Sequence, residues 1–385
     1  MSVEEVKAQA ATPAFDRYAH WRQGPARIAL AVLLLFMALA AWAPGMPREL
    51  ADAPDLAPQT AGSLSVASVA AKEAIEGEKD NDLLLYRRIA ERVAAGDDYY
   101  VAATELQRAN GYPVAPGLTV RLPTLAYVTA ALGAKGLVGL NLVLVFVALA
   151  FIYRRFAAEP GGDAVKLVGT ALLLVGLSTS MPAEFLSLHE VWSAELMVLS
   201  FALHRPDQGK WIAALLVAAA ALAVRELALP FVLLMGALAL WRGNRREALG
   251  WALLVALYAA ALAWHLSLAE AQIRPGDAVS PSWLALEGIG GWLYKIEHSS
   301  LLNLLPQVLA GPLAVLAVFG WTGWNSHAGR FGALLSLGYA LAFMIAGRQN
   351  NFYWGVIAVP FLFMGLAWMP FGLRNLIDAA REQRA

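Results

Sequence analysis

The sequence lacks cysteine and has few charged residues. Its zero cysteines exclude disulfides and thiolate chemistry. Charged residues make up only 15% of the chain, the formal net charge is +0, and no basic tract is present. The overall charge therefore gives no reason to expect a nucleic-acid partner.

Apolar residues dominate what is there. They make up 59% of the chain and come in runs of about 15 to 20 residues, the length that crosses a bilayer core of roughly 30 Å. This pattern predicts an all-α polytopic membrane protein with about ten transmembrane helices. The expected crossings are 26–43, 137–153, 164–180, 190–203, 211–224, 227–241, 248–266, 301–321, 331–346 and 354–371.

The first run and the arginines predict the topology. Residues 26–43 are too long for a typical signal-peptide core and lack a convincing cleavage site, so we expect an uncleaved span. Ten crossings place both termini on one side. Arginines mark that side as cytoplasmic. They are Arg17, Arg22, Arg27, Arg154, Arg155, Arg242, Arg245, Arg246, Arg374, Arg381 and Arg384. Residues 1–25 and 372–385 are then cytoplasmic tails of a transmembrane domain, 26–371.

The stretch 211–241 is too long for one crossing. As a single helix it would extend about 46 Å and bury Arg225 and Glu226 at its middle. We therefore expect two short helices that turn at these two residues on the outer side. Charge recessed in a membrane must face protein or water.

The large outer loop, residues 44–121, concentrates carboxylates. Its Ala/Pro/Ser-rich first part, residues 46–79, has no clear periodicity and receives no function. In the following stretch, KDNDLLLYRRIAERVAAGDDYY, an apolar stripe at helical spacing predicts a helix on the membrane surface, ended by Gly96. The stripe consists of Leu83, Tyr86, Ile89, Ala90 and Val93.

The four aspartates of this stretch allow two interpretations. Asp82 precedes the surface helix and Asp97 or Asp98 precedes the next one, so each can cap a helix N-terminus. Capping explains two of the four carboxylates; it does not explain Asp80 or whichever of Asp97 and Asp98 is not the cap. The alternative is a general base or a metal ligand at the mouth of an outer cavity, where burial and neighbouring arginines tune its pKa.

Several motifs resemble those of one enzyme class. Asp82-x-x-x-Tyr86, the helix, Gly96-Asp97 and GYPVAPGLTVRLPTLAYV resemble the first outer loop of GT-C class polyprenyl-phosphate-dependent membrane glycosyltransferases. HEVWSAELMVLSFAL, AVRELALPFVLL and GRQNNFYWGVIAVP resemble segments of bacterial mannosyltransferase and aminoarabinose transferase families. Two departures are Leu83, where those loops carry Glu, and Arg121-Leu122-Pro123 in place of Lys-Pro-Pro.

The resemblance implies a GT-C-like fold and a function. The enzyme would transfer a sugar, with inversion, from a polyprenyl-phosphate donor to a lipid or glycan acceptor at the outer face of a bacterial inner membrane. By the same resemblance Asp82 would be the general base, with Asp98 and then Asp80 as alternatives.

Arginine is the residue best suited to the leaving lipid phosphate, because its guanidinium matches phosphate oxygens. The candidates are Arg121, Arg225, Arg274 and Arg348, and the predicted substrate-binding set also includes Glu190, Tyr86 and Tyr353.

Arg225 and Arg348 rank first among these arginines, because each lies at the outer end of a span. Each also has a structural alternative. Arg225 could pair with Glu190, and less well with Glu226, because adjacent residues on a helix point apart. Arg348 could be an interfacial anchor beside Tyr353.

Other functions stay open at this point. His189-Glu190 on the outer side leaves a divalent metal open, although two residues do not make a site. A secondary transporter or flippase would show ionisable residues inside several spans. An O-antigen polymerase or ligase-like enzyme commonly carries its large outer loop late in the chain. Here the charges concentrate in one early loop, which favours chemistry at a membrane surface.

Overall fold

The computed structural model describes residues 17–43, 82–158 and 165–381. In these ranges the regular structure is helical and contains no strand. Four helices are long and apolar enough to cross a membrane by length and composition. They are α2 (Gln23–Trp42), α6 (Thr124–Ala157), α11 (Arg245–Glu270) and α14 (His327–Ile345). The described residues are therefore compatible with a helical membrane protein, as the sequence predicts.

The other expected crossings correspond to shorter helices. At 1.5 Å per residue, the four helices between α6 and α11 each extend only about 16 to 22 Å, less than a bilayer core. The shorter helices are α7 (Lys166–Gly176), α8 (His189–Leu203), α9 (Ile212–Val224), α10 (Leu229–Trp241) and α13 (Gln307–Gly323).

The last expected crossing, 354–371, is not one helix. It is divided among η9 (Gln349–Ile357), α15 (Val359–Gly365) and α16 (Met369–Arg381). Pro360 lies in the first turn of α15. A proline there has no backbone N–H to continue a preceding helix, so a new helix begins instead.

The split of 211–241 is confirmed. Helix α9 ends at Val224, and α10 begins after the short η7 turn (Glu226–Ala228). Arg225 between them has an extended backbone, with φ −149° and ψ 125°. The charged pair therefore lies at a turn rather than inside a helix.

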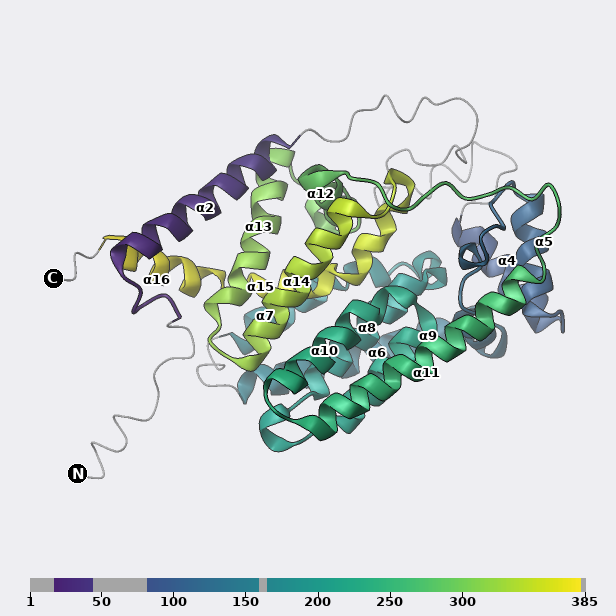
Figure 1. Cartoon of the computed structure of the whole chain (residues 1–385), viewed down its shortest axis with the longest axis horizontal. Helices are drawn as coiled ribbons and strands as arrows, with labels where there is room; N and C mark the ends of the chain where they lie inside the picture. The colour runs from purple at the N-terminus through teal and green to yellow at the C-terminus, as the bar shows by residue number, and fades with distance from the viewer. Residues whose placement is uncertain (1–16, 44–81, 159–164, 382–385) are drawn as a thin grey trace.

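The predicted helices of the first loop are also present. Helix α4 (Asp82–Ala94) buries Leu83, Leu85, Ile89 and Ala90, and is followed by Gly96 with φ 101°. Helix α5 (Tyr99–Ala109) follows. Figure 1 places α4 and α5 at one end of the molecule and α2 and α16 at the other.

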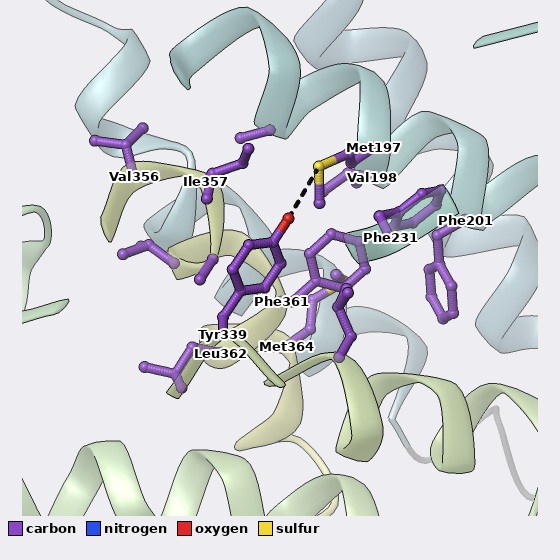
Figure 2. Packing of buried hydrophobic residues seen from close by; sticks show 14 of the residues in the cluster. Met197, Val198, Phe201, Phe231, Tyr339, Val356, Ile357, Phe361, Leu362 and Met364 are labelled. Carbon is purple, nitrogen blue, oxygen red and sulfur yellow. Dashed lines mark hydrogen bonds between the residues drawn. The ribbon is translucent and has the colours of Figure 1, made fainter. Parts of the chain in front are cut away.

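The core lies where α8, α10, α14, η9 and α15 meet, as Figure 2 shows. The Phe201 ring lies 5.4 Å from Phe331 and 5.6 Å from Phe361. Tyr339 donates to the Leu227 carbonyl at 2.7 Å, which ties α14 to the turn between α9 and α10. Helix α8 also packs directly against η9.

The helix α12 (Gly288–His298) and the segment 271–287 before it are not predicted by the sequence pattern. This segment forms isolated bridges at two places, Ala115 with Val279 and Leu284 with Ala346. It therefore links the end of the molecule that carries α5 to the residues just before η9.

Candidate functional site

Polar residues from distant parts of the sequence meet at one end of α8. They come from α4, from the chain before α6, from the start of α8, from the turn between α9 and α10, and from η9. We call this group the Arg121 cluster. Its members are Tyr86, Arg121, His189, Glu190, Arg225, Glu226, Tyr353 and Trp354.

Arg121 is held by two tyrosines. Its Nε donates to the Tyr86 hydroxyl at 3.0 Å, and its Nη2 donates to the Tyr353 hydroxyl at 3.2 Å. Among the residues that the structure describes, no carboxylate lies within the 4.0 Å of an ion pair. Because both hydroxyls accept from Arg121, each keeps its own O–H for another acceptor. Guanidinium and phenols together form a donor set suited to an anion.

Arg225, in contrast, is already neutralised. Its Nε lies 2.7 Å from Glu190 Oε1, and its Nη1 lies 2.5 Å from Glu226 Oε1. The expectation that Glu226 would be the poorer partner is wrong, because Arg225 has an extended backbone and not a helical one. Arg225 is only 1% exposed. This removes the reason for ranking Arg225 first, whereas Arg121 and Arg348 have no carboxylate partner among the described residues.

Buried polar atoms without a hydrogen-bond partner gather in the same place. They are His189 Nδ1, Glu190 Oε1, Arg225 Nε and Nη2, and Trp354 Nε1. The short Glu190–Arg225 contact is an ion pair that lacks hydrogen-bond geometry. Since buried polar atoms in proteins are nearly always hydrogen-bonded, these atoms are available to bind a ligand or water.

A groove of about 350 Å³ opens beside the cluster, between α4, α6 and the η5 turn (Ala183–Ser187). Tyr86 and His189 line both the groove and the cluster. Most of the other walls are apolar, and many of the residues are small. They include Ile89, Ala90, Ala94, Leu125, Ala126, Ala130, Ala134, Leu137, Val138, Ala183 and Leu186. A mostly apolar groove that begins at a cationic cluster, with Arg87, Glu91 and Lys135 also in its lining, suits an alkyl or isoprenoid chain with an anionic head.

Asp82 lies in the first turn of α4, one turn before Tyr86. Burial raises the pKa of Tyr86, the Arg121 charge partly offsets this, and the Asp82 carboxylate raises the pKa further. Asp82 is thus close enough to act electrostatically on the cluster. The phenol of Tyr86 stays protonated and able to donate.

Asp97 and Asp98 lie outside the cluster. Asp98 is exposed and caps α5, where its Oδ1 accepts from the Val101 N–H at 3.0 Å. The capping interpretation therefore holds for Asp98. Asp97 pairs with Arg92 at 2.5 Å. Asp80 and residues 46–79 lie outside the described residues.

Arg348 lies near the cluster without bonding to it. It is half-buried, and its Nη2 donates to Ser280 Oγ at 3.3 Å. Its contact is with the segment before α12 rather than with Arg121 or Arg225. Like Arg121, Arg348 has no carboxylate partner among the described residues, and its buried Nε has no hydrogen-bond partner, so it stays a candidate for the substrate anion.

Sequence reasoning missed a buried ion pair next to this site. Lys295 Nζ lies 2.5 Å from Glu287 Oε2, and Lys295 is 0% exposed. The only signal in the sequence is that Lys295 lies within the otherwise apolar stretch GIGGWLYKI and that Glu287 directly precedes this stretch. Such a signal does not show that the two side chains meet.

The described residues do not fit a divalent metal. Within them, no group of three or more His, Cys, Asp or Glu side chains is placed to hold one. The carboxylates of Glu190 and Glu226 are neutralised by Arg225 instead.

The chain matches no protein-family model, no curated protein and no solved structure. Its function has to be inferred from the site itself.

Proposed function

We propose that this protein is a membrane glycosyltransferase that uses a polyprenyl-phosphate sugar donor. The observation that carries the proposal is Arg121, a guanidinium held by two phenols, without a carboxylate partner among the described residues, beside an apolar groove. A lipid phosphate has the same two parts, an anionic head and an apolar chain. The head binds Arg121 and the chain lies in the groove between α4 and α6.

The chemistry is a single displacement at the anomeric carbon. The acceptor hydroxyl attacks this carbon while Asp82 takes the hydroxyl proton. The bond from the anomeric carbon to the phosphate oxygen breaks, and its electron pair stays on that oxygen. Arg121 and the O–H groups of Tyr86 and Tyr353 stabilise the released phosphate, because donors fixed in advance act most strongly where charge develops. One displacement inverts the anomeric configuration.

The proposed topology is GT-C-like with about ten crossings. The four long apolar helices support membrane insertion, and the arginines near span ends support cytoplasmic termini. The short helices α7 to α10 would then cross packed against the long ones. The Arg121 cluster would face the outer side of a bacterial inner membrane, where a lipid or glycan acceptor is available.

The test is release of free polyprenyl phosphate by the purified protein from donors labelled in the sugar. Donors carrying mannose and aminoarabinose are compared, each with and without a crude lipid and glycan acceptor fraction. We expect acceptor-dependent release from one donor, and loss of release in Arg121→Gln. Absence of release from every donor by the wild-type protein would refute the proposal.

A second candidate, a transporter or flippase, has one observation in its favour. Asn141 Nδ2 on α6 donates to Glu195 Oε1 on α8 at 2.9 Å, and Glu195 is 0% exposed. A carboxyl buried between apolar helices is typical of coupled transport. Glu195→Gln separates the two candidates. A transporter loses uptake in proteoliposomes with this variant, whereas the glycosyltransferase keeps its release of polyprenyl phosphate.

A further inference from the structure

The segment 347–355 carries three residues at or beside the site, namely Arg348, Tyr353 and Trp354. The residues that hold it come from α12 and from the segment before α12. Gly347 N–H donates to the Trp283 carbonyl at 2.8 Å, and Ser299 Oγ donates to the Phe352 carbonyl at 2.8 Å. Both parts of the segment are therefore attached to residues outside the Arg121 cluster.

Two glycines allow α12 to approach the segment this closely. A Cβ at Gly347 would lie 2.7 Å from Lys295 Cε and 3.1 Å from the Trp354 ring, and φ at Gly347 is +87°. A Cβ at Gly355 would collide with the Lys295 carbonyl oxygen. The segment thus packs on Lys295 at both of its ends, and only glycine fits at either place.

Lys295 is held in place by an ion pair with Glu287. Its Nζ lies 2.5 Å from Glu287 Oε2, and the two side chains are 0% and 6% exposed. Substrate cannot reach Lys295, so it takes no part in the chemistry. A buried ion pair also adds little net stability compared with apolar residues of the same volume. The pair is better explained by the geometry that it fixes.

We propose that the Lys295–Glu287 pair is a positioning device for the substrate site, a role that rests on the proposed function. The contacts run from Lys295 through Gly347 to the Trp354 ring, which lies 5.8 Å from the Arg225 guanidinium. The neighbouring Tyr353 reaches Arg121 at 3.2 Å. The pair therefore sets where the phenol and the indole lie relative to the two arginines.

The test uses the near-isosteric double variant Glu287→Gln/Lys295→Met, which removes both charges and keeps the volume. The melting temperature should stay within a few degrees of wild type, because no charge is left unpaired. The KM for the polyprenyl-phosphate donor should rise about tenfold, since a displacement of about 1 Å costs binding and orientation. The KM for the acceptor should not change.

Glu247→Gln is the matched control. Glu247 is buried in an ion pair with Arg242 at 3.0 Å, at the other end of α8, and contacts no residue of the Arg121 cluster. This variant should lower the melting temperature and leave the donor KM unchanged. A rise in donor KM of the same size in the control would overturn the positioning role, because general loosening would then explain it.

Amide hydrogen exchange gives a readout that does not depend on activity. In the double variant, peptides covering 347–355 should exchange at least several-fold faster, while peptides from α8 keep their wild-type rate. Unchanged exchange in 347–355 overturns the inference, whatever the kinetics show. If the wild-type protein releases no polyprenyl phosphate, the proposed function fails separately. If the double variant does not fold, the same measurements are made on Glu287→Asp, which keeps the negative charge but shortens the side chain by one methylene.

Discussion

Two buried ionic clusters lie at opposite ends of α8, and they differ in how completely their polar atoms are bonded. The first is the Arg121 cluster. The second, which we call the Glu247 cluster, gathers around one carboxylate that is 0% exposed. Four side chains bond to the Glu247 carboxylate. They are His204 at 2.7 Å, Arg242 at 3.0 Å, Asn244 at 3.0 Å and Trp251 at 3.3 Å.

Both oxygens of Glu247 are engaged, and the partners tie the ends of α8 and α10 to the start of α11. The Arg121 cluster contains one cation without a carboxylate partner among the described residues and several unpartnered polar atoms. Burial of charge is common to both. The difference is therefore one of bonding: the Glu247 cluster is saturated within the protein, whereas the Arg121 cluster keeps donors and acceptors that the proposed function assigns to substrate.

The largest effect should come from Asp82→Asn. The amide cannot accept a proton, so sugar transfer should fall about 10²- to 10⁴-fold. Asp82 is the first residue of α4, so loss of its charge removes a helix-dipole interaction of only about 0.3 to 1 kcal/mol, and the melting curve should move little. The measurement is donor turnover beside thermal unfolding in the same detergent. Turnover within a few-fold of wild type would show that Asp82 is not the general base and serves only at the start of α4.

The next effect is on stability, and it compares the paired Arg225 with Arg121, which has no carboxylate partner among the described residues. Arg225→Met leaves Glu190 and Glu226 without their partner, which should cost about 3 to 5 kcal/mol of unfolding free energy, as for other broken buried ion pairs. Arg121→Met leaves no carboxylate behind and should cost clearly less. Chemical unfolding in detergent gives both values. Equal losses in the two variants would show that Arg121 is also a structural residue.

A smaller effect concerns pH and α12. Burial raises the pKa of Glu297 to about 7 from its usual 4.5, and a hydrogen bond from Gln307 opposes this. Because the folded-state pKa is the higher one, this contribution to stability is complete below pH 4.5 and is lost as the pH rises through about 7. The full difference corresponds to about 3 kcal/mol. Glu297→Gln should flatten the fall in melting temperature between pH 5 and pH 8, and a fall of unchanged size would contradict the assignment to Glu297.

The helices could be predicted from the sequence because their signals are local. The turn at Arg225 follows from the excess length of 211–241, and α4 follows from its apolar stripe. Capping by Asp98 follows from its position before α5. The division of 354–371 was missed, although Pro360 carries the signal for it. The number of crossings stays a prediction, because four helices reach the length and composition of a span.

The site could be predicted only in part. Five members of the predicted substrate-binding set lie together in the structure: Tyr86, Arg121, Glu190, Arg225 and Tyr353. The sequence ranked Arg225 and Arg348 above Arg121, because it does not show which carboxylates pair with each arginine in the tertiary structure. The backbone at Arg225 allows Glu226 to fold back onto it, and this leaves Arg121 as the free cation of the described site. The position of Lys295 against Gly347 likewise depends on how α12 packs.

Binding of polyprenyl phosphate tests the central claim most directly, because the claim is that Arg121 holds a lipid phosphate. The measurement compares the dissociation constants of wild type, Arg121→Gln and Arg242→Gln for this lipid in detergent micelles. A lost hydrogen bond to a charged group costs about 1.5 to 3 kcal/mol, so Arg121→Gln should weaken binding by at least about tenfold. The dissociation constant of Arg242→Gln, whose substitution lies in the Glu247 cluster, should stay within about twofold of the wild-type value. Equal affinities for wild type and Arg121→Gln would contradict the assignment of Arg121 as the phosphate site.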